Sequence, residues 1–372
     1  MRAWGRRPEP AGSRPEPWFG FGFWFAFVLG LTLILGLPAA PAEDEKPAEP
    51  VWTSYTSGLE TFGISSLRIH PKRPNRLLAH VHGLGVAEST DGGKTWNTLH
   101  EGIDPKDLPG PHDPCVITLD GRDEDTLWLA MKGKTYRSRD GGTLWEPIKS
   151  NALTSWSWDK RESRMMIRGF AVDPRKSLHV FAGTWTEALW RGGLYETLDG
   201  GKTWELVAGS DEQDSELGFD AWPIILDPRT DKNVAVGGSE GFWVSDDRGR
   251  HFRRADPGEI GVHRVQFITP MSARNRDVYL CDRRGLWASR DGGRRWDKRP
   301  KLEGDCVTAF ADPRSRKRLF AVLRNRGLMI SEDGAHKKWK GLGYADLDIE
   351  EIVVPARTKN LMYFASPVTG LH

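Results

Sequence analysis

The sequence predicts an all-β fold built from repeated four-stranded antiparallel sheets. One short pattern, with a central Asp and a closing Trp or Phe, recurs six times along the 372 residues. Short β-branched and aromatic segments separated by turn residues precede the copies, which is typical of several strands per repeat. Trp, at 17 residues, outnumbers Phe at 15 and Tyr at 6, and Gly reaches 41. Such an excess of Trp and Gly fits one structural unit used many times.

The six copies recur at a nearly constant interval. Their starts are separated by 49, 59, 48, 44 and 42 residues. The mean of about 48 residues is the usual length of a four-stranded propeller blade. The copies begin at Ser89, Ser138, Thr197, Ser245, Ser289 and Ser331.

The repeated pattern predicts a tight turn between the third and fourth strand of each unit. In Ser89-Thr-Asp91-Gly-Gly93-Lys-Thr-Trp96, the carboxylate is placed to accept hydrogen bonds from backbone N–H groups that follow it. Glycine supplies the positive φ of such turns, and the closing aromatic residue is expected to pack between neighbouring sheets. The sixth copy has Ala335 in place of the second glycine, so we expect a distorted turn there. We assign a structural role, not acid–base chemistry, to the six aspartates Asp91, Asp140, Asp199, Asp247, Asp291 and Asp333.

These copies resemble Asp-box repeats, also called bacterial neuraminidase repeats, of the form Ser/Thr-x-Asp-x-Gly-x-x-Trp/Phe. The resemblance covers about residues 51–372. Similar repeats occur in sialidases, sortilin-type receptors, xyloglucanase-type glycosidases and photosystem II stability/assembly factors. The resemblance implies a β-propeller, but it says little about activity, because these families differ in function.

We predict a single seven-bladed β-propeller. The 330 residues that follow Ala42 make seven units of about 47 residues, but only six copies of the pattern exist. The seventh blade would therefore combine strands at 347–354, 361–365 and 369–372 with a fourth strand at 51–56. Pairing the N-terminal and C-terminal strands in this way would leave no free sheet edge. The alternative is six blades plus a stub.

Residues 1–42 read as an export segment. Four arginines precede an apolar run over residues 18–37, and the small residues Ala40 and Ala42 follow it. This is the pattern of a secretory signal peptide. The run is also about long enough to span a bilayer, so an N-terminal membrane anchor is the alternative. Residues 43–50 read as a linker. Both readings place residues 43–372 in the periplasm or outside the cell.

Charge and cysteine content exclude several classes of function. Lys+Arg at 53 and Asp+Glu at 51 leave a net charge of +2, which argues against a nucleic-acid partner. The three cysteines form no CxxC pair, so a zinc ribbon is excluded. Cys281 and Cys306 either pair between adjacent blades or, like Cys115, are small buried side chains. His80 and His82 share one face of a strand but lack a third ligand, so we expect neither a metal nor another cofactor.

One face of the predicted propeller is the candidate binding surface. It carries the loops from strand two to strand three and from strand four to strand one. Aromatic and basic side chains there would suit an anionic ligand, a carbohydrate or an acidic protein surface. The residues that we assign to this face are Trp158, Arg168, Trp185, Trp190, Arg191, Trp222, Arg264, Arg283, Arg324 and Arg326.

We expect a monomeric, non-catalytic scaffold for recognition or assembly, with a protein or glycan partner in the cell envelope. The resemblance to the photosystem assembly factors implies this class of function. The alternative is a glycoside hydrolase, which needs two facing carboxylates; the candidates are Glu187, Asp220 and Glu240. The segment Arg68-Ile69-His70-Pro71 lacks the Arg-Ile-Pro motif that a sialidase would need before its first repeat.

Overall fold

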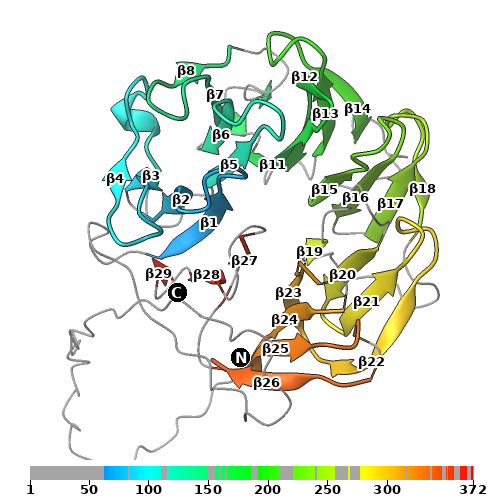
Figure 1. The fold of residues 1–372 in the computed structure, drawn as a ribbon. Coiled ribbons are helices and arrows are strands. Elements are labelled where there is room, and N and C mark those ends of the chain that lie inside the picture. The colour runs from blue at the N-terminus through cyan, green and yellow to red at the C-terminus, as the bar shows by residue number, and fades with distance from the viewer. Residues whose placement is uncertain are drawn as a thin grey trace, which may run out of the picture.

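The protein is an all-β propeller whose sheets are arranged around a ring (Figure 1). The structure is a computed structural model. It describes residues 63–371 except 83, 110–114, 132, 150–155, 159–160, 164–165, 186–191, 210–220, 239–240, 256–266, 269–276, 313, 316, 336, 346–348, 350, 356–360 and 367–369.

Six four-stranded antiparallel sheets form blades 1 to 6 in chain order. Blade 1 has β1 (Ile64–Ile69), β2 (Leu77–Val81), β3 (Gly85–Ser89) and β4 (Asn97–Thr98). Blade 2 has β5 (Cys115–Leu119), β6 (Leu127–Met131), β7 (Lys134–Ser138) and β8 (Glu146–Pro147). Blade 3 has β11 (Met166–Asp173), β12 (Lys176–Trp185), β13 (Gly193–Thr197) and β14 (Glu205–Gly209). Blade 4 has β15 (Ile224–Leu226), β16 (Val234–Gly238), β17 (Gly241–Ser245) and β18 (Arg253–Arg254). Blade 5 has β19 (Phe267–Ile268), β20 (Val278–Asp282), β21 (Gly285–Ser289) and β22 (Asp297–Glu303). Blade 6 has β23 (Cys306–Ala311), β24 (Leu319–Leu323), β25 (Gly327–Ser331) and β26 (Lys340–Gly343).

Three further elements stand outside these six blades. The short helix η1 (Pro105–Asp107) follows blade 1, and the hairpin β9 (Trp156–Trp158) and β10 (Arg161–Ser163) precedes blade 3. The C-terminal sheet has three strands, β27 (Glu351–Val353), β28 (Tyr363–Ser366) and β29 (Gly370–Leu371).

The prediction of seven complete blades is wrong, and the described residues match the alternative of six blades plus a stub. Among the described residues, the C-terminal sheet has three strands. Only six copies of the turn pattern exist, and that turn is what leads the third strand of a blade into its fourth. The proposed fourth strand at residues 51–56 lies outside the described residues.

The C-terminal sheet nevertheless fills the position between blade 6 and blade 1. Strand β27 contacts both β23 and β1, and β28 contacts β1 (Figure 1). Among the described residues, seven apolar clusters each join two neighbouring sheets around the ring. Burial of apolar surface between sheets is therefore what holds the ring together.

The aromatic residues that close the repeats lie in these clusters, as predicted. Trp96 packs with Tyr363 of the C-terminal sheet, and Trp204 packs with Trp128 of blade 2. Phe252 packs with Phe181 of blade 3. Each of these rings thus fills the interface between its own blade and the preceding sheet.

The antiparallel connections define two ends of the ring. We call one end the loop face and the other the turn face, and strand three of each blade runs from the loop face to the turn face. The loop face carries the connections between strands two and three, and the turn face carries the repeat turns. The two faces therefore present different parts of each repeat to solvent.

Residues 1–42 and the linker at 43–50 lie outside the described residues. Within the described part of the chain, no helix is long and apolar enough to cross a membrane.

Candidate functional site

The repeat turns share one hydrogen-bond pattern. In the first copy, the Ser89 hydroxyl donates to Asp91 Oδ1 at 2.8 Å and accepts from Gly93 N at 2.7 Å. Asp91 Oδ1 also accepts from Thr95 N at 2.9 Å. The same bonds recur in the other copies, where the carboxylates of Asp140, Asp199, Asp247, Asp291 and Asp333 take the place of Asp91. These carboxylates are occupied by their own turns, which leaves them poorly placed for acid–base chemistry.

Hydrogen bonds keep the turn carboxylates ionised. Burial raises the pKa of Asp91, but hydrogen bonds from Thr95 and Ser89 outweigh it and lower the pKa to about 2. The N–H and hydroxyl groups of Thr203 likewise lower the pKa of Asp199 to about 2. Charged acceptors strengthen the bonds that define each turn.

The sixth turn keeps the serine hydrogen bond of the other copies, but Asp333 accepts from Lys337 N and Lys338 N through Oδ2 and not Oδ1. Ala335 N donates to the Ser331 hydroxyl at 3.0 Å, as the glycine does in the other copies. The turn is kept because Ala335 adopts a φ of 64°, the left-handed conformation that glycine normally supplies. In the fourth copy, Arg248 occupies the first glycine position with a φ of 71°.

Three of the predicted loop-face residues lie at the loop-face ends of blades 3 and 4. Arg168 lies at a bulge in β11, and Trp185 pairs with Met166 at the end of β12. Trp222 precedes β15 and its backbone N–H donates to the Gly237 carbonyl at 2.9 Å. All three side chains are half-buried. An aromatic and basic group therefore stands at this edge of the loop face.

Two strand glycines position this group, and the sequence analysis did not single them out. A Cβ at residue 169 would lie 1.8 Å from the Trp222 ring, so the ring packs directly on Gly169. A Cβ at residue 183 would lie 1.7 Å from the Ala221 carbonyl oxygen. Glycine inside a strand is the signal that would have indicated this close approach.

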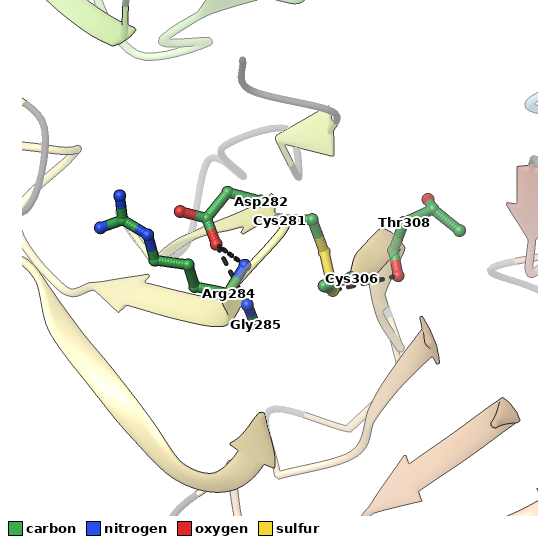
Figure 2. Close-up of a disulfide and its surroundings, with 6 residues drawn as sticks. All are labelled: Cys281, Asp282, Arg284, Gly285, Cys306 and Thr308. Atoms are coloured by element: carbon green, nitrogen blue, oxygen red, sulfur yellow. Dashed lines mark hydrogen bonds between the residues drawn. A yellow bond between two sulfur atoms is a disulfide. The ribbon is translucent and has the colours of Figure 1, made fainter. Parts of the chain in front are cut away.

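A second group of predicted residues lies on blades 5 and 6. Arg283 is exposed in the turn after β20, where Asp282 Oδ1 accepts from Arg284 N at 2.8 Å and from Gly285 N at 3.0 Å (Figure 2). Arg324 Nε donates to Asp305 Oδ2 at 2.9 Å. Arg326 is exposed and donates to the Glu303 carbonyl at 3.2 Å.

A disulfide joins the strands that carry these turns. Cys281 and Cys306 form a disulfide (Figure 2). Cys281 directly precedes Asp282 in the chain, and Cys306 directly follows Asp305. The two Cα atoms are 5.0 Å apart. The pairing of Cys281 with Cys306, which the sequence left open, is thus present, and Cys115 is a buried free cysteine.

The remaining predicted site residues are not placed. Trp158 belongs to β9, but its side chain is outside the described part of the structure. The basic and aromatic residues Trp190, Arg191 and Arg264 also lie outside the described residues, as do the carboxylates Glu187, Asp220 and Glu240.

Among the described residues, no group of three His, Cys, Asp or Glu side chains is placed to hold a metal ion. His80 is buried in β2, and the centroids of its ring and that of His82 are 5.6 Å apart. These two rings share an end of blade 1 without a third ligand among the described residues.

Comparison with known proteins shows the fold and no closer relationship. No protein-family model matches the chain, and no curated protein matches its sequence. Solved structures match over most of its length. The GH74 xyloglucanase from Xanthomonas campestris matches with a TM-score of 0.63 and 18% identity, over 84% of this chain and 51% of that one. The chain therefore spans about half the length of that enzyme.

Two other kinds of protein share the fold. YCF48 from Cyanidioschyzon merolae matches with a TM-score of 0.57 and 15% identity, over 84% of this chain and 96% of that one. A structure of YCF48 bound to D1 peptide matches with a TM-score of 0.58 and 13% identity, over 85% and 94% of the two chains. The extracellular domain of a putative hybrid two-component system from B. thetaiotaomicron matches with a TM-score of 0.57 and 12% identity, over 85% and 40%. A xyloglucanase, a peptide-bound protein and the extracellular domain of a two-component system thus share this propeller fold.

Proposed function

We propose that the chain is an exported, non-catalytic scaffold that binds a protein partner on the loop face. The observation that carries this proposal is the group of Arg168, Trp185 and Trp222 at the edge between blades 3 and 4. Half-buried Trp and Arg side chains held by neighbouring strands are the residues that dominate protein interfaces. The exposed Arg283 and Arg326 extend the same face over blades 5 and 6.

The comparisons support a scaffold of this kind. The chain and YCF48 align over nearly the whole of YCF48, and one such structure holds a peptide. A propeller of this fold can therefore present a surface to a peptide. The xyloglucanase, by contrast, is about twice as long as the part that this chain matches.

The disulfide supports export. Disulfides persist in oxidising compartments such as the periplasm and the cell exterior, and are rare in the cytosol. The Cys281–Cys306 bridge is therefore consistent with the apolar run at residues 18–37, whether that segment is cleaved or retained as an anchor.

The test begins with affinity capture of the full chain from the native cell envelope, followed by direct binding of the captured protein to purified variants. Arg283→Glu and Arg326→Glu should each weaken binding by about tenfold, because each reverses one exposed charge on the loop face. Lys202→Glu, on the turn face, is the matched control and should leave binding unchanged. Equal effects of all three substitutions would contradict a partner site on the loop face.

The alternative function is a glycoside hydrolase with a glycan substrate. It is decided by incubating the purified chain with a glycan panel that includes xyloglucan. If the purified chain releases sugar, and Glu187→Gln, Asp220→Asn or Glu240→Gln abolishes that release, the protein is a glycoside hydrolase and the scaffold proposal is wrong. The scaffold proposal expects no release from any glycan.

A further inference from the structure

A pocket of about 580 Å³ opens on the turn face between blades 1 and 2, and we propose that it binds a neutral polyhydroxyl ligand such as a sugar unit. Its volume lies within the range of small-molecule sites, which is about 300–1,000 Å³. The pocket is lined by Arg73, Pro74, Asn75, Arg76, Glu88, Thr90, Asp125, Asp140 and Thr143. It is separate from the loop face and independent of the partner proposed there.

Arg76 is a buried cation that lines the pocket. Its side chain is only 8% exposed and forms an ion pair with Glu88 of the same blade. The guanidinium also donates to the Gly141 carbonyl of the neighbouring blade's turn. The buried Nη1 has no hydrogen-bond acceptor among the described residues, and Asp125 Oδ1 lies 3.9 Å away. One nitrogen of this buried guanidinium therefore lacks an acceptor within the described part of the chain, so a ligand with an acceptor atom at this end of the pocket would be favoured.

The rim holds a second pair of opposite charges. Arg73 Nη2 donates to Asp125 Oδ1 at 2.9 Å, and the two side chains are 54% and 52% exposed. The exposed Thr90 and Thr143 belong to the repeat turns of blades 1 and 2. Thr143 donates its hydroxyl to the Asp140 carbonyl at 3.1 Å.

The lining of the pocket carries both carboxylates and guanidinium groups, and this mixture favours one chemical class of ligand. An anion would face the carboxylates of Glu88, Asp125 and Asp140, and a cation would face two guanidinium groups. A neutral ligand avoids both conflicts. It must also donate to carboxylates and accept from guanidinium groups, and a hydroxyl does both. Several neighbouring hydroxyls on one small ring meet these requirements together.

The proposal predicts a preference that can be measured. The purified full chain is titrated with glucose, myo-inositol, glucuronate and glucosamine, and binding is followed by saturation-transfer NMR and calorimetry. Glucose or inositol should bind saturably, and the charged probes should bind about tenfold more weakly. Asp125→Asn should shift the preference toward glucuronate, and Arg73→Gln should shift it toward glucosamine.

A shift of preference in opposite directions cannot come from loss of folding. Glu332→Gln is the matched control, because Glu332 is an exposed carboxylate that also pairs with an arginine, Arg318, but on blade 6. It should leave every affinity unchanged. Thr90→Val and Thr143→Val keep all the charges and should weaken all four probes alike, by a few-fold, without changing the preference among them. Absence of saturable binding by both neutral probes, or a preference that neither charge variant moves, would overturn the proposal.

Discussion

Glu351 at the start of the C-terminal sheet forms an ion pair with Arg68 of blade 1, 283 residues earlier in the chain. The same carboxylate accepts a hydrogen bond of 2.7 Å from the backbone N–H of Leu67. Leu67 is fully buried, and it packs with Tyr363 and Ala365 of the C-terminal sheet. One carboxylate therefore joins the last sheet to the first blade through both a side chain and the backbone.

Glu351→Ala should lower the free energy of unfolding by about 1–3 kcal/mol, because it leaves the buried Leu67 N–H without an acceptor. Glu351→Gln keeps an acceptor oxygen and loses only the charge, so its cost should be smaller. Urea unfolding of the two variants checks this order. A Gln variant as unstable as the Ala variant would mean that the ion pair, not the backbone hydrogen bond, holds the two ends together.

The disulfide between blades 5 and 6 should contribute about 3 kcal/mol to stability, since it closes a loop of 25 residues. Replacing both Cys281 and Cys306 with Ser, or adding a reductant, should lower the melting temperature to the same extent. Cys115→Ser is the control, because Cys115 is buried but unpaired, and reductant should still destabilise that variant. A melting temperature of the natural chain that is insensitive to reductant would contradict this role.

The repeat turns were predictable because their bonds are local. Ser89, Asp91 and Gly93 lie within five residues of each other, so the pattern of residue types specifies the hydrogen bonds almost alone. The number of complete blades was not predictable in the same way. The local pattern does predict the three strands of the C-terminal sheet, at 347–354, 361–365 and 369–372. Whether a fourth strand completes that sheet depends on how distant ends of the chain pair, which no local pattern indicates.

The candidate site was predictable only in part, because the repeat spacing indicates which residues lie at a strand end but not how they pack across blades. Topology places Arg168, Trp185 and Trp222 at one end of blades 3 and 4, and the spacing of the repeats indicates that end. The packing of Trp222 on Gly169 joins residues of two different blades, and residue types alone do not reveal it. The pocket beside Arg76 also depends on contacts across a blade interface, with Asp125 and Gly141 of blade 2.

His70 should make stability fall as the pH drops below about 6.5. It is 1% exposed, and its Nδ1 accepts from the backbone N–H groups of Lys72 and Arg73 at 3.2 and 3.0 Å. Burial, followed by the charge of Arg73, lowers the pKa of His70 below its usual 6.5. The unfolded state therefore binds more protons than the folded state in this range, so acidification favours unfolding.

The matched variant for this test is His70→Asp. The corresponding loop of blade 2 begins with Asp120, whose carboxylate accepts from Arg122 N at 2.8 Å in the same way. Asp at position 70 should keep the loop and reduce the loss of stability between pH 7.5 and 5.5. The residual slope should come from His100, whose pKa is also lowered by burial. Unfolding free energies at three pH values check this, and identical slopes for the two proteins would exclude His70.

The second glycine of the repeat turns should tolerate alanine only where the neighbouring blade leaves room. At Gly293, φ is 88° and a Cβ would lie 2.6 Å from Phe242 Cε1. Gly293→Ala should therefore cost about 2–4 kcal/mol from backbone strain and overpacking. Ala335→Gly should be nearly neutral, because relief of strain offsets the loss of a buried methyl group. Thermal melting of both variants checks this contrast; an equally mild effect at Gly293 would show that Phe242 moves aside freely.

Gly169→Ala should displace the Trp222 ring, because the new methyl group would occupy the position of the ring. We expect a loss of stability of about 1–3 kcal/mol from overpacking and at least a tenfold loss of binding on the loop face. To separate the effect on the Trp222 ring from an effect on the backbone of β11, Gly169→Ala is also made in a Trp222→Leu variant. In that background, Gly169→Ala should cost much less, so the two substitutions should be strongly non-additive in a double-mutant cycle measured by urea unfolding. Additive costs would show that Gly169 is required for the conformation of β11 itself and not for the position of Trp222.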